Sequence, residues 1–100
     1  MAVKVFIKRS VKNGKTAKAL ELLKEVRSLA LKQPGYISGE TLVNHYDPCS
    51  ITVVSTWQSI DDWIRWEESD ARSGKEDQLE GLQEGPTQFE IYDLGLPGAK

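Results

Sequence analysis

Three tryptophans are the residues of this sequence best suited to hold a flat aromatic molecule, and they lie close together in the chain. Trp57 is followed at short intervals by Trp63 and Trp66. A spacing of three residues places the last two on one face of a helix, where they could line a substrate cavity. Aromatic residues at helical spacing more often form protein core. We prefer that alternative for Trp57 and Trp63, whereas the two interpretations are balanced for Trp66.

Two more residues could position a ligand. Tyr36 could orient one through its hydroxyl group, and Arg72 could attract an acidic substrate through its guanidinium group. The alternative for Tyr36, as for Tyr92, is packing on a sheet face at a dimer interface. The alternative for Arg72, as for Arg65, is an ion pair with an acid at positions 67, 68 or 70.

Acid–base chemistry has only weak candidates, and the catalytic residues stay unassigned. Asn44 could hold an enolate or phenolate oxygen, although an asparagine at a strand end more often caps a turn. His45 has an unperturbed pKa near neutrality and could act as a general base, although a lone histidine in a turn is more often exposed to solvent. The neighbouring acid pairs at 61–62 and 67–68 do not face one another on a helix and are poor catalytic pairs.

Several functional classes are excluded by composition. Cys49 and His45 are the only cysteine and the only histidine, so the sequence predicts no disulfide and no metal site, and it fits the reducing cytoplasm. Neither a phosphate-binding loop nor a dinucleotide fingerprint is present. No apolar run could span a membrane, and residues 1–10 alternate instead of forming a signal peptide.

Charge is distributed unevenly along the chain. Residues 1–32 carry nine Lys or Arg and two Glu, whereas the remaining residues carry four basic and thirteen acidic side chains. No aromatic residues interleave with the basic ones as a base-stacking surface would require, so we do not expect a nucleic-acid partner. Attraction within the fold or across a dimer explains the division equally well.

The positions of apolar residues predict the elements that would carry these side chains. Strands are expected over 2–9, 36–44, 51–57 and 87–94, and the main helix is expected over 15–32, with Asn13 as its N-cap. Capping boxes at Ser59–Asp62 and Ser73–Glu76 predict two short helices. This order predicts one α+β domain over residues 1–95, with a ferredoxin-like β-α-β-β-α-β layout, and a C-terminal tail over 96–100.

The predicted four-stranded antiparallel sheet has helices on one face only. The other face would carry four apolar residues, namely Phe6, Leu42, Tyr92 and Leu94. Because a bare apolar face of this size is usually covered, we expect the chain to form a homodimer through it.

These residues together resemble the antibiotic biosynthesis monooxygenase (ABM) domain, a family of the dimeric α+β barrel superfamily. The matching features run from Val3 to about Leu94 and include Asn13-Gly-Lys15, Gln33-Pro-Gly-Tyr36 and Asp47-Pro48. The segment from Trp57 to Asp70 carries most of the resemblance.

The resemblance implies a cofactor-independent monooxygenase that oxidises a small aromatic or quinol-type substrate with dioxygen, in a cavity near Trp66. A related branch degrades heme with an asparagine, a tryptophan and a histidine. Only the tryptophan is matched, at Trp66, and the place of the histidine falls near Glu76. Heme degradation is therefore disfavoured, although heme binding without turnover stays open. The alternatives are a non-catalytic dimeric module that binds a small ligand and a dimer used only for interaction.

Overall fold

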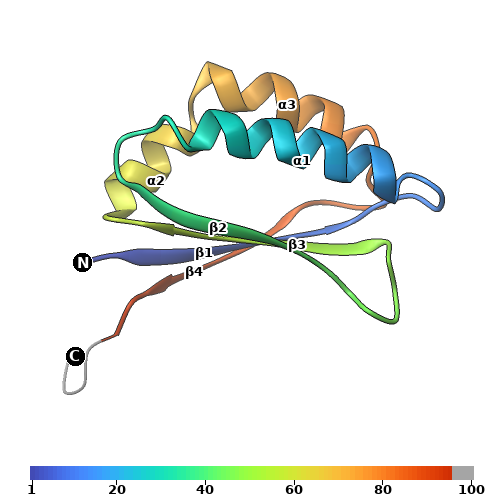
Figure 1. Cartoon of the computed structure of the whole chain (residues 1–100), viewed down its shortest axis with the longest axis horizontal. Helices are drawn as coiled ribbons and strands as arrows, with labels where there is room; N and C mark the ends of the chain where they lie inside the picture. The colour runs from blue at the N-terminus through green and yellow to red at the C-terminus, as the bar shows by residue number, and fades with distance from the viewer. Residues whose placement is uncertain (96–100) are drawn as a thin grey trace.

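The computed structural model describes residues 1–95 and contains four strands and three helices in that range (Figure 1). The elements are β1 (Val3–Ser10), α1 (Thr16–Ala30), β2 (Tyr36–Val43), β3 (Ser50–Trp57), α2 (Ile60–Glu67), α3 (Asp70–Glu80) and β4 (Gln88–Asp93). The tail predicted over 96–100 lies outside the described residues.

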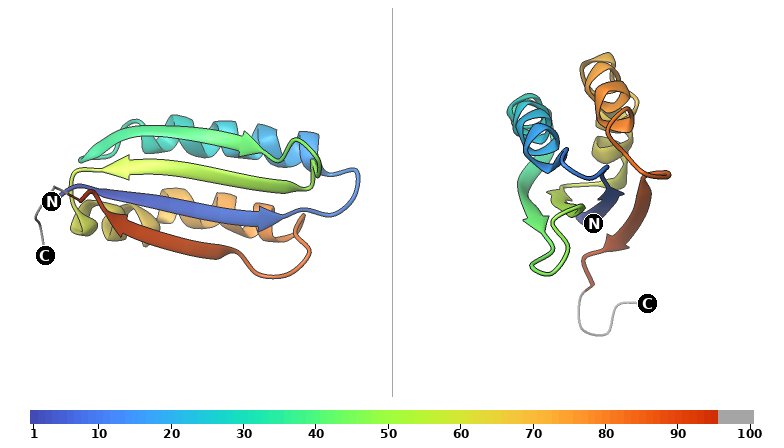
Figure 2. Two further views of the ribbon diagram at one scale, coloured as in Figure 1. Left: turned by 90° about the horizontal axis from the view of Figure 1, so that it is seen from below. Right: turned by 90° about the vertical axis from the view of Figure 1, so that its right-hand side faces the viewer.

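The strands form one antiparallel sheet in the order β2-β3-β1-β4, with β1 and β3 at its centre. All three helices lie on one face, with α1 on the β2 side and α2 and α3 on the β4 side (Figure 2). The predicted ferredoxin-like α+β fold is therefore confirmed. Within residues 1–95, no helix is long and apolar enough to cross a membrane.

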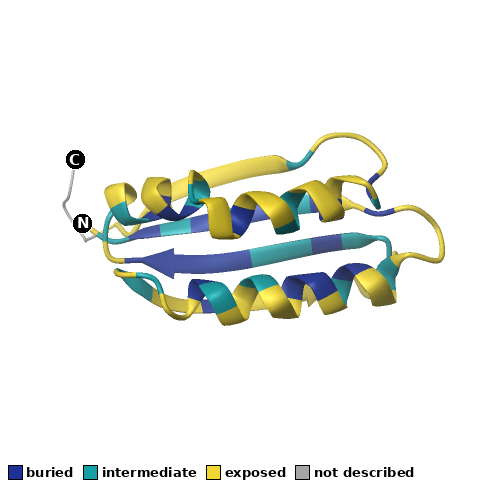
Figure 3. Cartoon of the chain, turned by 90° about the horizontal axis from the view of Figure 1, so that it is seen from above, coloured by how far each residue is buried: buried dark blue, intermediate teal, exposed yellow. Residues whose placement is uncertain are grey.

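Alternation along β1 and helical spacing along α1 place the core between these layers. Val3 and Val5 of β1 point toward the helices and are almost completely buried, and Leu22 and Leu23 of α1 point toward the sheet. Figure 3 shows burial concentrated on the central strands and on the facing sides of the helices, whereas the edge strands are largely exposed.

Two predicted helix starts are wrong. Asn13 does not cap α1, because residues 12–15 form a turn closed by a bond from the Lys15 N–H to the Lys12 carbonyl, and Lys15 takes the N-cap position. Ser73 does not begin α3. Ser69 has extended backbone and accepts a hydrogen bond from the Arg72 N–H, so α3 begins one turn earlier. The capping box at Ser59 agrees with the structure.

A β-bulge changes the direction of one predicted site residue. The pairing of β2 with β3 shifts between Tyr36 and Ser38, so Ile37 is an extra residue in the ladder. The alternative that placed Tyr36 on the open face of the sheet, at a dimer interface, is therefore wrong. Tyr36 lies on the helix-covered face, where its ring packs edge-on against Trp57.

The turn between α1 and β2 requires glycine at position 35. Gly35 has a φ of +83°, and a Cβ there would overlap the carboxylate of Asp62 on α2. We expect Gly35→Ala to lower the free energy of unfolding by about 2–3 kcal/mol. The matched control is Gly14→Ala, which has a φ of +80° and open space around it; its loss should be about 1 kcal/mol. Equal losses in urea unfolding would contradict the proposed contact with Asp62.

Candidate active-site cavity

A cavity of about 50 Å³ lies between the sheet and the helices. Its walls include Trp57 at the end of β3, the α2 residues Trp63 and Trp66, and Tyr36 from β2. Other lining residues, Arg27 of α1 and Glu40 and Thr41 of β2, are exposed. The cavity therefore opens to solvent between α1 and β2, and the tryptophans form its closed part.

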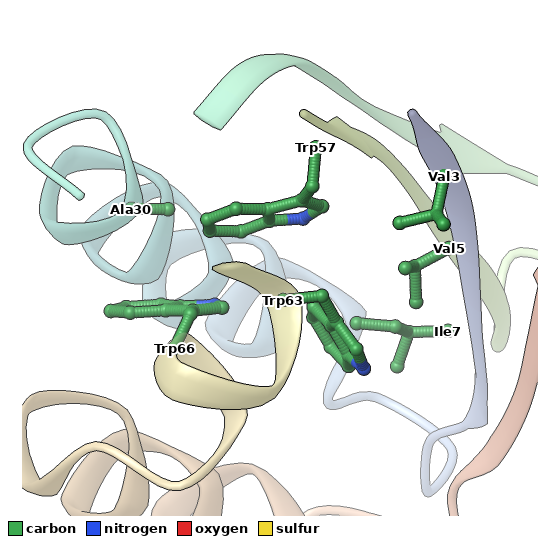
Figure 4. Packing of buried hydrophobic residues seen from close by; sticks show 7 residues of the cluster. All are labelled: Val3, Val5, Ile7, Ala30, Trp57, Trp63 and Trp66. Carbon is green, nitrogen blue, oxygen red and sulfur yellow. The ribbon is translucent and has the colours of Figure 1, made fainter. Parts of the chain in front are cut away.

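The three indole rings pack around one another (Figure 4). Trp57 and Trp66 are nearly parallel, with an angle of 25° between their planes and 6.4 Å between ring centroids, and Trp63 lies 6.0 Å from Trp57 at 64°. The indole N–H of Trp57 donates to Ser55 Oγ at 3.1 Å. The buried Nε1 of Trp63 has no hydrogen-bond partner among residues 1–95. The rings thus give the cavity a flat, apolar wall.

A cluster of three charged side chains completes the cavity. Glu76 of α3 forms ion pairs with Arg9 of β1 and with Arg72 in the first turn of α3. Both guanidinium groups contact the same oxygen, Glu76 Oε1, with Arg9 Nη2 at 2.5 Å and Arg72 Nη2 at 3.2 Å. The Arg72 guanidinium also lies 5.6 Å from the centroid of Trp63 and 5.9 Å from that of Phe89. Burial lowers the pKa of Arg9, Glu76 opposes this shift, and the charge of Arg72 adds to it.

Five predicted substrate-binding residues line this cavity, namely Trp57, Trp63, Trp66, Tyr36 and Arg72. The structure thus brings together residues from β2, β3, α2 and α3. The ion pairs expected for the two arginines are wrong: Arg65 pairs with Asp62 and Arg72 with Glu76, because each acid lies three or four residues away on the same helix face.

The two weak catalytic candidates do not lie at the cavity. Asn44 and His45 are in the turn between β2 and β3, at the opposite end of the sheet from α2 (Figure 1). Asn44 Oδ1 accepts hydrogen bonds from the N–H groups of Tyr46 and Asp47, which is the turn-capping role considered as its alternative. His45 is exposed, and its ring contacts Tyr46.

Sequence reasoning missed Arg9 and Glu76. Arg9 continues the inward-facing series of Val3, Val5 and Ile7, so a charge at this position was the available signal. Glu76 follows Arg72 by four residues on one helix face, but that relation depends on α3 beginning at Asp70. Among residues 1–95, no group of three His, Cys, Asp or Glu side chains could hold a metal ion.

Comparison with known families identifies the fold. The model of the antibiotic biosynthesis monooxygenase family matches residues 2–74, which include every cavity residue named above except Glu76. The chain belongs to the antibiotic biosynthesis monooxygenase family. No curated protein matches the sequence.

Solved structures share the fold of this chain. A conserved protein from Methanosarcina mazei Go1 superposes with a TM-score of 0.87 at 23% identity, covering 92% of this chain and 91% of its own. SnoaB from Streptomyces nogalater, described as a cofactor-independent oxygenase, gives 0.86 at 15% identity over 95% and 94% of the two chains. At these identities the two structures establish a shared fold.

The residues at this site do not match a heme-degrading site. Glu76 lies at the place where the resemblance would put a histidine, and its carboxylate is held by two guanidinium groups. His45, the only histidine of the chain, lies in the distant turn.

Proposed function

We propose that this protein is a cofactor-independent monooxygenase that oxidises a small aromatic or quinol-type compound with dioxygen. The observation that carries the proposal is the cavity itself, which combines three indole rings with a buried cluster of two guanidinium groups and one carboxylate. Family membership and the described activity of SnoaB support the same reaction class.

The chemistry requires little from the protein beyond binding and electrostatics. A substrate with an acidic phenol O–H or ring C–H loses that proton, and its anion, whose charge extends onto a ring carbon that still carries hydrogen, passes one electron to dioxygen, giving a substrate radical and superoxide. These combine into a peroxide on carbon. Cleavage of the O–O bond, with loss of the remaining proton from that carbon, leaves one oxygen as a carbonyl and releases the other as water. The indoles of Trp57 and Trp66 would hold the ring away from water, and the net positive charge of the cluster would attract a negatively charged substrate.

Cavity size limits the substrate. A cavity of about 150 Å³ accommodates benzene in another protein, and this one measures about 50 Å³. A single ring therefore requires a lining side chain to move. Tyr36 and Arg27 at the solvent side are the candidates, since they are less buried than the tryptophans. A small substrate fits this arrangement better than a polycyclic one.

A second candidate is a non-catalytic module that binds a small ligand. Glu76 is the carboxylate in the closed part of the cavity, and it already accepts contacts from both guanidinium groups, which opposes a role as proton acceptor. Glu40, the other lining acid, is exposed at the mouth. The oxygenase proposal therefore requires that solvent accepts the substrate proton. A lack of turnover would favour the binding module.

Oxygen uptake with a panel of hydroquinones and anthrones tests the proposal. We expect uptake above spontaneous oxidation for at least one single-ring compound, and a loss of roughly tenfold or more in Trp66→Phe, because the ring would lose part of its supporting surface. Heat-denatured protein is the control for spontaneous oxidation. No uptake with any compound would favour the binding module.

We also propose that the protein is a homodimer through the open face of the sheet. Leu42, Tyr92 and Leu94 are 40–53% exposed there, and Phe6 packs edge-on against Tyr92. A second copy would cover this apolar surface by twofold symmetry.

Sedimentation equilibrium tests the dimer. The wild-type chain should have twice the monomer mass, and Tyr92→Glu should be monomeric because it places a charge in the apolar surface. Ile60→Glu is the matched control, since Ile60 is 39% exposed on α2, on the helix-covered side of the sheet (Figure 2). A wild-type monomer at micromolar concentration would contradict the proposal.

A further inference from the structure

The charged cluster has one more positive charge than its own acid can neutralise. Arg9 and Arg72 both contact Oε1 of Glu76, so two guanidinium groups share one carboxylate. The side chains of the two arginines are 2% and 7% exposed, and that of Glu76 is 13% exposed. A buried charge without a partner is strongly unfavourable, so this excess calls for an anion.

Other charges around the cavity do not remove the excess. Arg27 and Glu40 line the mouth, are both exposed, and cancel one another in charge. Glu80, one turn after Glu76 on α3, is close enough to act on Arg9 electrostatically, but it is exposed to solvent and makes no ion pair within the described part of the chain.

Three buried donors at this cavity, two in the charged cluster and one on a neighbouring indole, have no hydrogen-bond acceptor among residues 1–95. They are Arg9 Nε, Arg72 Nη2 and Trp63 Nε1, and all three side chains line the cavity. Arg72 Nη2 is within ion-pair distance of Glu76 without hydrogen-bond geometry. Buried donors are rarely left unpaired, so three of them on side chains that line one cavity favour a ligand with several acceptor positions. The donor atoms themselves are closed off, so a ligand reaches them only with the side-chain movement that the size of the cavity already requires.

We propose that this cluster binds the carboxylate of a small aromatic acid, which makes the substrate a quinol-type ring that bears a carboxylate. A carboxylate has two oxygens that can accept from Arg9, Arg72 and Trp63 together, whereas a phenolate has one. The excess charge is present before any reaction, so it is matched by a group that is already anionic on binding. The oxidation of the ring rests on the proposed monooxygenase function. The binding of the carboxylate is independent of that function.

Tryptophan fluorescence gives a direct test, because all three tryptophans of the chain line the cavity. Titration with sodium benzoate should change the emission, and benzamide, which has the same shape without the charge, should bind about tenfold to a hundredfold more weakly. Equal affinity for the two compounds, or no response to benzoate, would overturn the proposal. This comparison needs no variant and so does not depend on whether a substitution folds.

Variants identify the cluster as the binding site. Arg72→Met should weaken benzoate binding by about tenfold or more, whereas Arg65→Met, the same change at an arginine outside the cavity, should leave it unchanged. Glu76→Gln removes the internal carboxylate and should make benzoate bind more tightly. Weaker binding by Glu76→Gln, or an equal loss in Arg65→Met, would contradict the assignment.

Oxygen uptake separates this inference from the proposed function. Benzoate binding without uptake of oxygen on 2,5-dihydroxybenzoate keeps the carboxylate site and removes the oxygenase. Oxidation of hydroquinone by a protein that does not bind benzoate keeps the oxygenase and removes the carboxylate site. Preferential oxidation of the dihydroxybenzoate, inhibited by benzoate, supports both.

Discussion

Replacement of Trp57 with alanine is expected to lower the free energy of unfolding by about 3–5 kcal/mol. Trp57 is completely buried and contacts Tyr36, Trp63 and Trp66, so its removal leaves a cavity where three elements meet. Urea unfolding followed by circular dichroism measures the change. A protein of this size has little stability beyond that amount, so partial unfolding at 37 °C is also expected.

The matched control for this experiment is Phe89→Ala. Phe89 also contacts the cluster, through Trp63, but it is 42% exposed on the edge strand β4. We expect a loss of about 1–2 kcal/mol, because water already reaches much of this ring. Equal losses for the two variants would show that Trp57 is not the centre of the packing.

The second large effect is expected from Glu76→Gln, which should lower the free energy of unfolding by about 3–5 kcal/mol. The substitution keeps the size of the side chain but leaves the buried guanidinium groups of Arg9 and Arg72 without a counter-charge. The same urea unfolding experiment measures it, and added benzoate should recover part of the loss by binding only to the folded protein.

Glu25→Gln provides the control for that charge effect. Glu25 bonds Lys75 at 2.5 Å and thereby joins α1 to α3, but the two side chains are 53% and 28% exposed. Solvent screens such a pair, so its loss should cost less than about 1 kcal/mol. If Glu76→Gln lowers the free energy of unfolding by as little as Glu25→Gln does, water solvates the two guanidinium groups and no anion is needed to balance them.

The sequence was sufficient to predict the layers of this fold, because alternation in β1 and helical spacing in α1 are each determined by burial on one face. The same helical spacing puts Trp63 and Trp66 on one face of α2, and both line the cavity. Local errors arose where hydrogen bonds in the folded chain compete. Ser69 and Ser73 are both acceptable N-caps in sequence, and only Ser69 has extended backbone.

The candidate site was less predictable because it depends on contacts between distant segments. The bulge at Ile37 turns Tyr36 into the cavity, and nothing in the local alternation indicates an extra residue there. Arg9 and Glu76 are 67 positions apart and meet only when α3 lies over β1. A charged residue in an inward-facing strand series was the one signal that sequence reasoning left unused.

A crystal structure of the protein soaked with benzoate tests most directly whether this cavity is the functional site. We predict that the ring lies against Trp57 and Trp66, with its carboxylate within hydrogen-bond distance of Arg72 and Trp63, and that Tyr36 or Arg27 has moved to admit it. An empty cavity with its tryptophans in unchanged positions, or benzoate bound only on the open face of the sheet, would contradict this account.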